Sequence, residues 1–137
     1  MKETIHCRGH EHVRATHTST LEVTTDDWLT PAGDCILGIE ADRSPADFSP
    51  EFISACQDAE ATITALLQTA NHDAAVVGRG HPDLTFKSER GAVLRTSTYV
   101  DERTVMVEAD AAAADIDREL IETLTDGEAL TTTLVVE

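Results

Sequence analysis

Short apolar segments alternate with polar turns along the chain, and this pattern predicts eight strands and two helices. Extended apolar segments occur at 4–8, 19–24, 35–41 and 62–68, and a second series occurs at 74–79, 91–98, 104–109 and 131–137. Between the last two strands of each series, apolar residues recur at i, i+1 and i+4, which is typical of one helical face. Ser49, followed by Pro50, and Asp117 are the expected N-caps of the two helices.

The two series also have similar sequences, which predicts an internal duplication. Residues 40–69 align with 108–137 without gaps at a constant offset, and about 12 of 30 pairs are identical. An Arg-Gly-His segment at 8–10 likewise matches one at 79–81, at an offset that is three residues larger. The first half should therefore carry three extra residues between Thr24 and Glu40.

The predicted fold class is α+β, mainly β, built from two β-β-β-α-β repeats. Neither repeat alone would bury enough surface, so we expect one domain over 1–137 with repeats at 1–70 and 71–137. The repeats would share one core around a pseudo-two-fold axis, as a barrel or as packed sheets with two helices.

The three extra residues fall near a predicted Gly33-Asp34 turn. Gly33 would supply backbone freedom, and the Asp34 side chain could accept hydrogen bonds from backbone amides. This turn resembles the Gly-Asp turn of small duplicated β-barrels of the cradle-loop type. Trp28, which precedes the turn, is expected to cover the core beneath it.

The composition is strongly acidic, and this changes which partners are expected. Asp and Glu number 26 against 10 Lys and Arg, the net charge is −16, and only Lys2 and Lys87 are lysines. Such a surface suits a high-salt cytoplasm, where screening weakens self-repulsion, so a halophilic archaeal source is expected. The absence of a basic stripe argues against general nucleic-acid binding and against anionic membrane surfaces.

The hydropathy of the chain and its cysteine content predict a cytoplasmic location. No apolar run approaches the ~20 residues of a membrane span, and the N-terminal residues lack the apolar segment of a signal peptide. The three cysteines, Cys7, Cys35 and Cys56, are odd in number and widely spaced, so no disulfide framework is predicted. An oligomer remains compatible with these features.

Several segments together resemble a known family. They are "RGHEHVRATHTSTLEVTTDDWLTPAGDCILGIEAD" at 8–42, "GRGHPDL" at 78–84 and "VMVEADAAAADIDRELIE" at 105–122. The chain resembles, over nearly its whole length, the archaeal domain of unknown function family DUF371. The resemblance implies an archaeal source, but it implies no activity, cofactor or catalytic residue.

The duplicated Arg-Gly-His segments and a nearby histidine are the first candidate site. If the pseudo-two-fold axis brought the segments together, arginine, histidine and backbone amides would form an anion pocket, with the Gly33-Asp34 turn at its rim. Its expected ligand-binding residues are Arg8, His10, His17, Arg79 and His81. Alternatively, the motif marks a strand end, where glycine permits a bend and arginine pairs with Asp42 or Asp110.

Residues that break the repeat are the second set of candidates. His17 aligns with Ser88, and Asp34-Cys35 aligns with Glu102-Arg103. The candidate catalytic residues are His17, Asp34 and Cys35. Cys35 could act as a nucleophile with His17 or His10 as its base, or His17 could act as a general base that Glu22 orients. Alternatively, Cys35 simply fills space in an apolar strand. The candidate metal ligands are His10, His17 and Cys35, although their spacing matches no metal motif.

These features favour a binding module for a small anionic ligand, such as a nucleotide or a phosphorylated metabolite. The alternatives are a small enzyme that uses the His, Asp and Cys groups, with or without a metal, and a structural subunit of a complex. The sequence assigns no cofactor.

Overall fold

The structure is a computed structural model that describes all 137 residues. The first half contains β1 (Lys2–Arg8), β2 (Thr20–Thr24), β3 (Ile36–Gly38), η1 (Pro45–Asp47), α1 (Pro50–Cys56) and β4 (Thr62–Gln68). The second half contains β5 (Asp73–Arg79), β6 (Gly91–Arg95), β7 (Thr104–Met106), η2 (Ala113–Asp115), α2 (Arg118–Thr125) and β8 (Ala129–Val136). All predicted strands and both helices are therefore present, and the elements follow the same order in each half. Neither helix is long and apolar enough to cross a bilayer.

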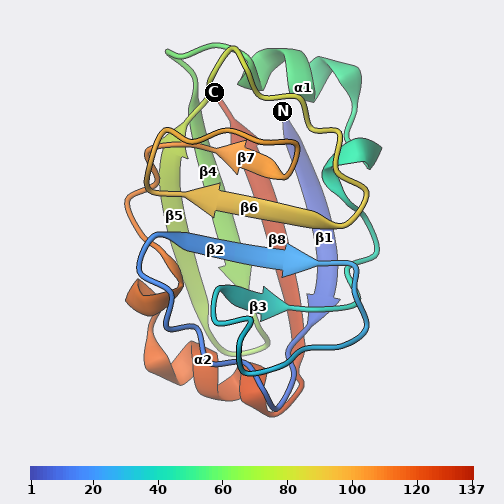
Figure 1. The fold of residues 1–137 in the computed structure, drawn as a ribbon, viewed down its shortest axis with the longest axis vertical. Coiled ribbons are helices and arrows are strands. Elements are labelled where there is room, and N and C mark those ends of the chain that lie inside the picture. Colours follow the sequence, from blue (N-terminus) through green and yellow to red (C-terminus); the bar gives the residue numbers. More distant parts are fainter.

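The strands form two four-stranded sheets with the orders β1-β8-β4-β5 and β3-β2-β6-β7. Figure 1 shows the second sheet crossing in front of the first at a steep angle, with α1 and α2 at opposite ends of the molecule. Each sheet has two edge strands, so there is no closed barrel. Of the two expected architectures, the two sheets are confirmed, and the closed barrel is wrong.

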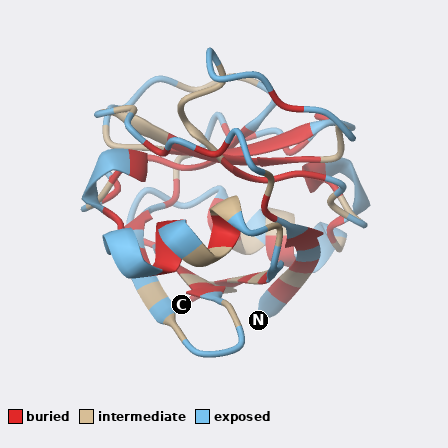
Figure 2. Ribbon diagram, turned by 90° about the horizontal axis from the view of Figure 1, so that it is seen from below, coloured by how far each residue is buried: buried red, intermediate tan, exposed pale blue.

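The core lies between the two sheets and beneath the helices. Figure 2 shows the buried residues concentrated between the layers and the exposed residues on the outer loops. Strand β4 has the alternating burial expected for one face on a core, because Ile63, Ala65 and Leu67 are buried. Both predicted caps are confirmed, since Ser49 Oγ accepts from the amide of Phe52 and the Asp117 carboxylate accepts from that of Glu119.

The pairing at the centre of each sheet joins corresponding positions of the two halves. In the β2–β6 pair, Glu22 lies opposite Val93. In the β4–β8 pair, Leu66 lies opposite Thr133. Each central pair therefore joins one strand from the first half to one from the second.

The last strand corrects the gap-free alignment of the halves. The burial pattern of β4 recurs in β8 when Ile63 is matched with Leu130, one residue earlier than the constant offset predicts. The connection from α2 to β8 is two residues shorter than that from α1 to β4, whereas α2 is one residue longer than α1, which leaves a net shift of one residue. Gly127 in the shorter connection adopts a φ of 79°. The alignment is therefore wrong by one residue over the last strand.

The Gly33-Asp34 turn forms for a different reason than expected. Gly127 is the only glycine with a positive φ, so Gly33 supplies no left-handed conformation. It supplies space instead, because a Cβ there would lie 2.9 Å from Leu29 Cδ1. The backbone carbonyl of Asp34, not its side chain, accepts hydrogen bonds from the chain. Trp28 is 58% exposed and does not cover the core, where Leu29 is buried instead.

Candidate functional site

A cavity of about 550 Å³ lies on the face of the second sheet that points away from the core. Its walls come from β2 and the loop that follows, from the loop before β6, and from the turn before β7. We call it the Glu22 cavity, and its polar lining includes Glu22, Thr24, Asp26, Lys87, Ser88, Glu89, Arg90, Glu102 and Arg103.

Glu22 is the most buried carboxylate of this cavity. It lies in the middle of β2 between core residues and is only 8% exposed. Its Oε1 accepts a hydrogen bond from the Cys35 thiol at 3.6 Å, and its Oε2 lies 3.8 Å from a guanidinium nitrogen of Arg103. Burial raises the pKa of Glu22, although the Arg103 charge acts in the opposite direction. Gly91 makes room for this carboxylate, because a Cβ there would collide with Oε2.

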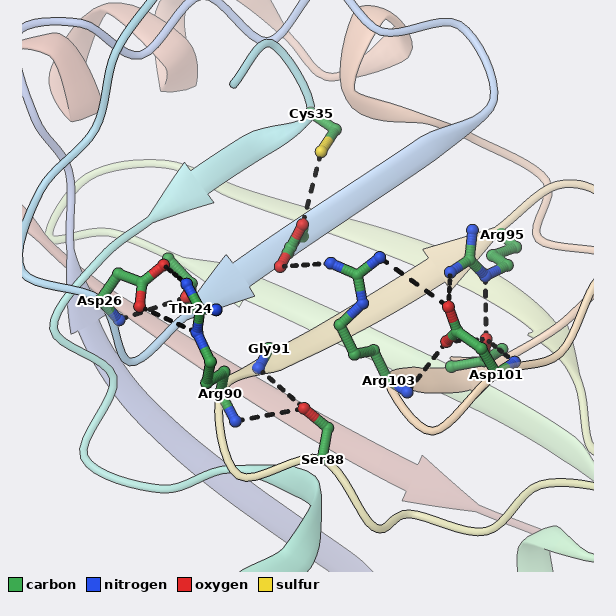
Figure 3. A network of polar contacts seen from close by, with 11 residues as sticks. Thr24, Asp26, Cys35, Ser88, Arg90, Gly91, Arg95, Asp101 and Arg103 are labelled. Atoms are coloured by element: carbon green, nitrogen blue, oxygen red, sulfur yellow. Dashed lines mark hydrogen bonds and ion pairs between the residues drawn. The ribbon is translucent and has the colours of Figure 1, made fainter. Parts of the chain in front are cut away.

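Arg103 lies between two carboxylates, as Figure 3 shows. Its other terminal nitrogen lies 3.8 Å from Asp101 Oδ2. Asp101 also pairs with Arg95 at 3.0 Å and accepts from the backbone amide of Arg103 at 2.9 Å. Burial alone would raise the pKa of Asp101, but these contacts and the Thr104 hydroxyl outweigh it, so the pKa is lowered. Both guanidinium contacts of Arg103 are longer than hydrogen bonds, so its N–H groups remain free to donate.

The opposite wall offers further donors. Arg90 is held by Asp26 through bonds of 2.8 and 3.2 Å. Ser88 Oγ accepts from the backbone amides of Arg90 and Gly91 at 3.1 and 3.2 Å, so its hydroxyl proton remains available for another acceptor. Lys87 lines the cavity and forms no ion pair within the chain. The cavity therefore contains hydrogen-bond donors that have no acceptor within the chain, together with carboxylates that position the arginines.

The two Arg-Gly-His segments do not meet. The amide of Gly9 donates to Glu128 O at 2.8 Å, next to α2, whereas the amide of Gly80 donates to Ala61 O at 3.0 Å, next to α1. These helices lie at opposite ends of the molecule (Figure 1). No single pocket is therefore lined by Arg8, His10, Arg79 and His81 together.

Within each segment, the glycine and the histidine have local structural roles. A Cβ at Gly9 or Gly80 would collide with backbone atoms near the end of the neighbouring helix. The ring Nδ1 of His10 accepts from the amide two residues later at 3.0 Å, and that of His81 does the same at 3.0 Å. These contacts match the interpretation of the motif as a strand end.

The arginines of the segments do not have the expected carboxylate partners. Arg8 pairs with Glu40, and Arg79 forms no side-chain contact with an acid. Asp42 accepts instead from the amide of His6, and Asp110 accepts from that of Val77. The predicted pairing of these arginines with Asp42 or Asp110 is therefore wrong.

The structure does bring His17, Asp34 and Cys35 to one corner of the second sheet. The backbone amide of His17 donates to Asp34 O at 3.2 Å. The ring Nδ1 of His17 accepts from the amides of Ser19 and Thr20 at 3.2 and 3.1 Å. Ser88 Oγ accepts from two amides at the corresponding place in the second half, so histidine and serine perform the same capping role there.

Cys35 is poorly suited to the predicted role of nucleophile. Burial first, and then the negative charge of Glu22, raises the pKa of its thiol to about 11. The thiol is therefore protonated near neutral pH. No hydrogen bond joins it to His17, which would have to act as its base.

The predicted metal ligands do not form a metal-binding group. The structure contains no cluster of three or more His, Cys, Asp or Glu side chains that could hold a metal ion. The ring of His10 lies 4.9 Å from that of His12, measured between centroids. His10, His17 and Cys35 therefore do not form a three-residue cluster of this kind.

The sequence did not predict the Glu22 cavity, and Glu22 was expected only as a residue that could orient His17. One usable signal was Glu22 itself, a charged residue between Leu21 and Val23 that lies opposite Val93 of the second half. The second usable signal was the difference between Cys35 and Arg103 at aligned positions, which suggested a role for the cysteine but none for the arginine. Because these residues lie far apart in the sequence, their meeting at Glu22 requires the sheet pairing.

The chain belongs to the family described as Domain of unknown function (DUF371), which it matches over residues 5–137. It is also similar to an uncharacterized protein of the archaeon Methanocaldococcus jannaschii. The two are 40% identical over 136 residues, which cover 99% of this chain and 100% of the relative. The predicted family membership is thereby confirmed.

Proposed function

We propose that this DUF371 protein binds a small anionic ligand, such as a nucleotide or a phosphorylated metabolite, in the Glu22 cavity. The observation that carries the proposal is the distribution of positive charge. Three of the chain's ten Lys and Arg side chains line this one cavity, although the net charge is −16. Four carboxylates also line the cavity, but its ratio of three cationic to four acidic side chains exceeds the ten to 26 of the whole chain, so it repels an anion less than the average surface does.

The chemistry of the donors supports the same assignment. Arg103 presents a forked guanidinium that no acid in the chain holds at hydrogen-bond distance, and this geometry suits carboxylate or phosphate oxygens. The Ser88 hydroxyl and the Lys87 ammonium supply donors from the opposite wall. The Arg-Gly-His segments offer less, because their histidine Nδ1 atoms already accept backbone hydrogen bonds.

We also infer that the two halves arose by duplication, which explains where the cavity lies. Corresponding elements follow the same order, and Glu22 pairs with its counterpart Val93 at the centre of the second sheet. Cys35 and Arg103 are counterparts too, and each contacts Glu22 from its own half. A site on the line that relates the halves would occur once per chain.

The proposal is tested by comparing Arg103→Ala with Arg79→Ala. Untagged protein would be purified at high KCl, since the lysine-poor acidic composition fits a high-salt cytoplasm, and examined by native mass spectrometry for a retained small molecule. Calorimetric titration with nucleotides and phosphorylated metabolites would then give affinities. We expect Arg103→Ala to weaken binding at least tenfold, equivalent to about 1.4 kcal/mol, and Arg79→Ala to bind like the wild type. The reverse ranking would return the site to the Arg-Gly-His segments.

A second candidate function is an enzyme that uses Glu22 as a general acid–base. It is favoured by one observation, the buried carboxylate whose pKa burial raises within the cavity. Mass spectrometry of each bound candidate over time distinguishes the two functions. Conversion that stops in Glu22→Gln would indicate the enzyme, whereas an unchanged ligand would indicate the binding module.

A further inference from the structure

We propose that the Glu22 cavity selects an oxyanion that carries a proton, such as inorganic phosphate, over one that is fully ionised, such as sulfate. Glu22 is the specificity-determining residue, because it accepts the hydrogen bond that the protonated oxyanion donates. This inference rests on the proposed function and narrows the class of ligand.

The distances around Arg103 bring the anion next to Glu22. An anion oxygen bound to the guanidinium would lie about 2.8 Å from the nitrogen. One terminal nitrogen of Arg103, a residue that lines the cavity, lies 3.8 Å from Glu22 Oε2. An anion oxygen bound to this nitrogen on the side that faces Glu22 would therefore also contact the carboxylate. Two unprotonated oxygens in such contact repel each other, whereas one shared proton turns the contact into an O–H···O hydrogen bond.

The hydrogen bonds of Glu22 leave one oxygen open for this role. Oε1 is occupied by the thiol of Cys35, but no group of the chain donates to Oε2 within hydrogen-bond distance. Because Oε2 is not fully enclosed by the chain, it can accept a hydrogen bond from a molecule in the cavity. A hydroxyl group on the ligand would supply the missing donor.

The charged groups around Glu22 are few enough to predict a pH dependence. Arg103 before β7 and Arg95 on β6 favour its ionised form, whereas Asp26 after β2 disfavours it. Cys35 before β3 donates a hydrogen bond to it, and Lys87, Arg90, Glu89 and Glu102 line the far wall. Burial outweighs the favourable charges, so Glu22 resists ionisation. Sulfate carries no proton, so it can form the hydrogen bond with Glu22 only when Glu22 is protonated. Inorganic phosphate carries a proton and can donate it to the hydrogen bond with ionised Glu22.

The test is calorimetric titration of the wild-type chain with sodium phosphate and sodium sulfate at high KCl, from about pH 5 to about pH 8. Sulfate affinity should fall about tenfold per pH unit once Glu22 ionises, whereas phosphate affinity should change much less. In Glu22→Gln, the amide can donate to either anion, so the preference for phosphate and the pH dependence of sulfate binding should both disappear. The matched control is Glu122→Gln, which removes an exposed carboxylate of α2 outside the cavity, and it should keep the wild-type preference.

The possible results separate the inference from the proposed function. If the wild type binds phosphate and sulfate with the same pH dependence, or if Glu22→Gln keeps the preference, the specificity role is overturned and the binding function stands. If the wild type binds neither of these anions nor any metabolite, both are overturned. The wild-type comparison needs no substitution, so it decides the matter even if Glu22→Gln folds poorly.

Discussion

The two halves of the chain have similar backbone conformations and similar side-chain-to-backbone hydrogen bonds. They differ in the side chains that surround the Glu22 carboxylate. His17 in one half and Ser88 in the other both accept hydrogen bonds from two following amides. Ala15 and Phe86 both adopt a left-handed conformation, with φ values of 50° and 54°. By contrast, the central position of the second sheet holds a carboxylate from the first half opposite a valine from the second.

This contrast indicates which sequence differences deserve a functional explanation. The exchange of His17 for Ser88 looks large in chemical terms, but both side chains supply the acceptor that the same backbone turn needs. The exchange of Cys35 for Arg103 changes what contacts the buried Glu22 carboxylate, and the fold does not require it. A residue that differs between the halves is informative about function when its side chain forms no hydrogen bond with the local backbone and lines a cavity.

The largest expected effect is the loss of stability when the glycine of either Arg-Gly-His segment is replaced, and it tests whether both glycines pack equally tightly against the neighbouring chain. Gly9→Ala and Gly80→Ala should each destabilise the protein by about 3 kcal/mol, because a Cβ at either position would collide with backbone atoms beside the neighbouring helix. Denaturant unfolding at high KCl measures both changes. The control is Gly127→Ala, where no neighbouring atom is near and the positive φ should cost only about 1 kcal/mol. A mild effect at one of the two glycines would show that the ends of the molecule are built differently.

The next prediction concerns the cysteine that contacts Glu22. Alkylation of Cys35 in the native protein should be slow near neutral pH and accelerate about tenfold per pH unit toward its pKa of about 11. Cys7 and Cys56 are buried and should stay unmodified. Glu22→Gln removes a negative neighbour, so Cys35 should react faster at the same pH. Peptide mass spectrometry measures each rate, and fast modification of Cys35 at neutral pH would revive its role as a nucleophile.

A smaller effect is expected where β4 and β8 differ in the core. Thr132 is buried and its Oγ1 has no hydrogen-bond partner, whereas the corresponding residue of β4 is Ala65. Thr132→Val keeps the shape and removes the unsatisfied hydroxyl, so stability should rise by about 1 kcal/mol. Thr131→Val, at a half-buried neighbouring position, is the control and should give no such gain. Equal changes in the denaturation midpoints of the two variants would count against this explanation.

The smallest expected effect is the pH dependence of stability that Glu22 contributes. Burial raises its pKa in the folded state above the unfolded value of about 4.3. Between these two values the folded chain binds the proton and the unfolded chain does not, so the wild type loses stability as the pH rises. Glu22→Gln should therefore gain stability relative to the wild type across this window, and unfolding curves at several pH values measure the difference. A difference that does not change with pH would mean that Glu22 ionises normally.

Much of the fold could be predicted from the sequence, because strands and helices are local patterns. The capping residues Ser49 and Asp117 and the order of the elements follow from nearby residues, and the structure has them as predicted. The pairing of strands into two sheets depends on contacts between distant segments. The one-residue shift at β8 depends on the Gly127 connection, which a gap-free alignment hides.

Less of the candidate site could be predicted, for the same reason. The sequence analysis chose residues of conspicuous chemistry, such as His10 and His81, whose rings turn out to accept local backbone hydrogen bonds. The environment of Glu22 is created by Cys35, Gly91 and Arg103 together. The burial of the Glu22 carboxylate and its distance from Arg103 depend on contacts between distant segments, so neither could be predicted from one segment alone.

The most direct test of the central claim is to remove the difference between the halves at Glu22 and measure anion binding. In the double variant, Glu22→Val matches Val93 and Arg103→Cys matches Cys35, so the two halves become identical at both pairs of positions. Phosphate titration under reducing conditions at high KCl should give one bound anion per chain for the wild type and none for the variant, with unfolding of the variant still cooperative. Undiminished binding by the variant, or two anions per wild-type chain, would contradict the account and point back to the paired Arg-Gly-His segments.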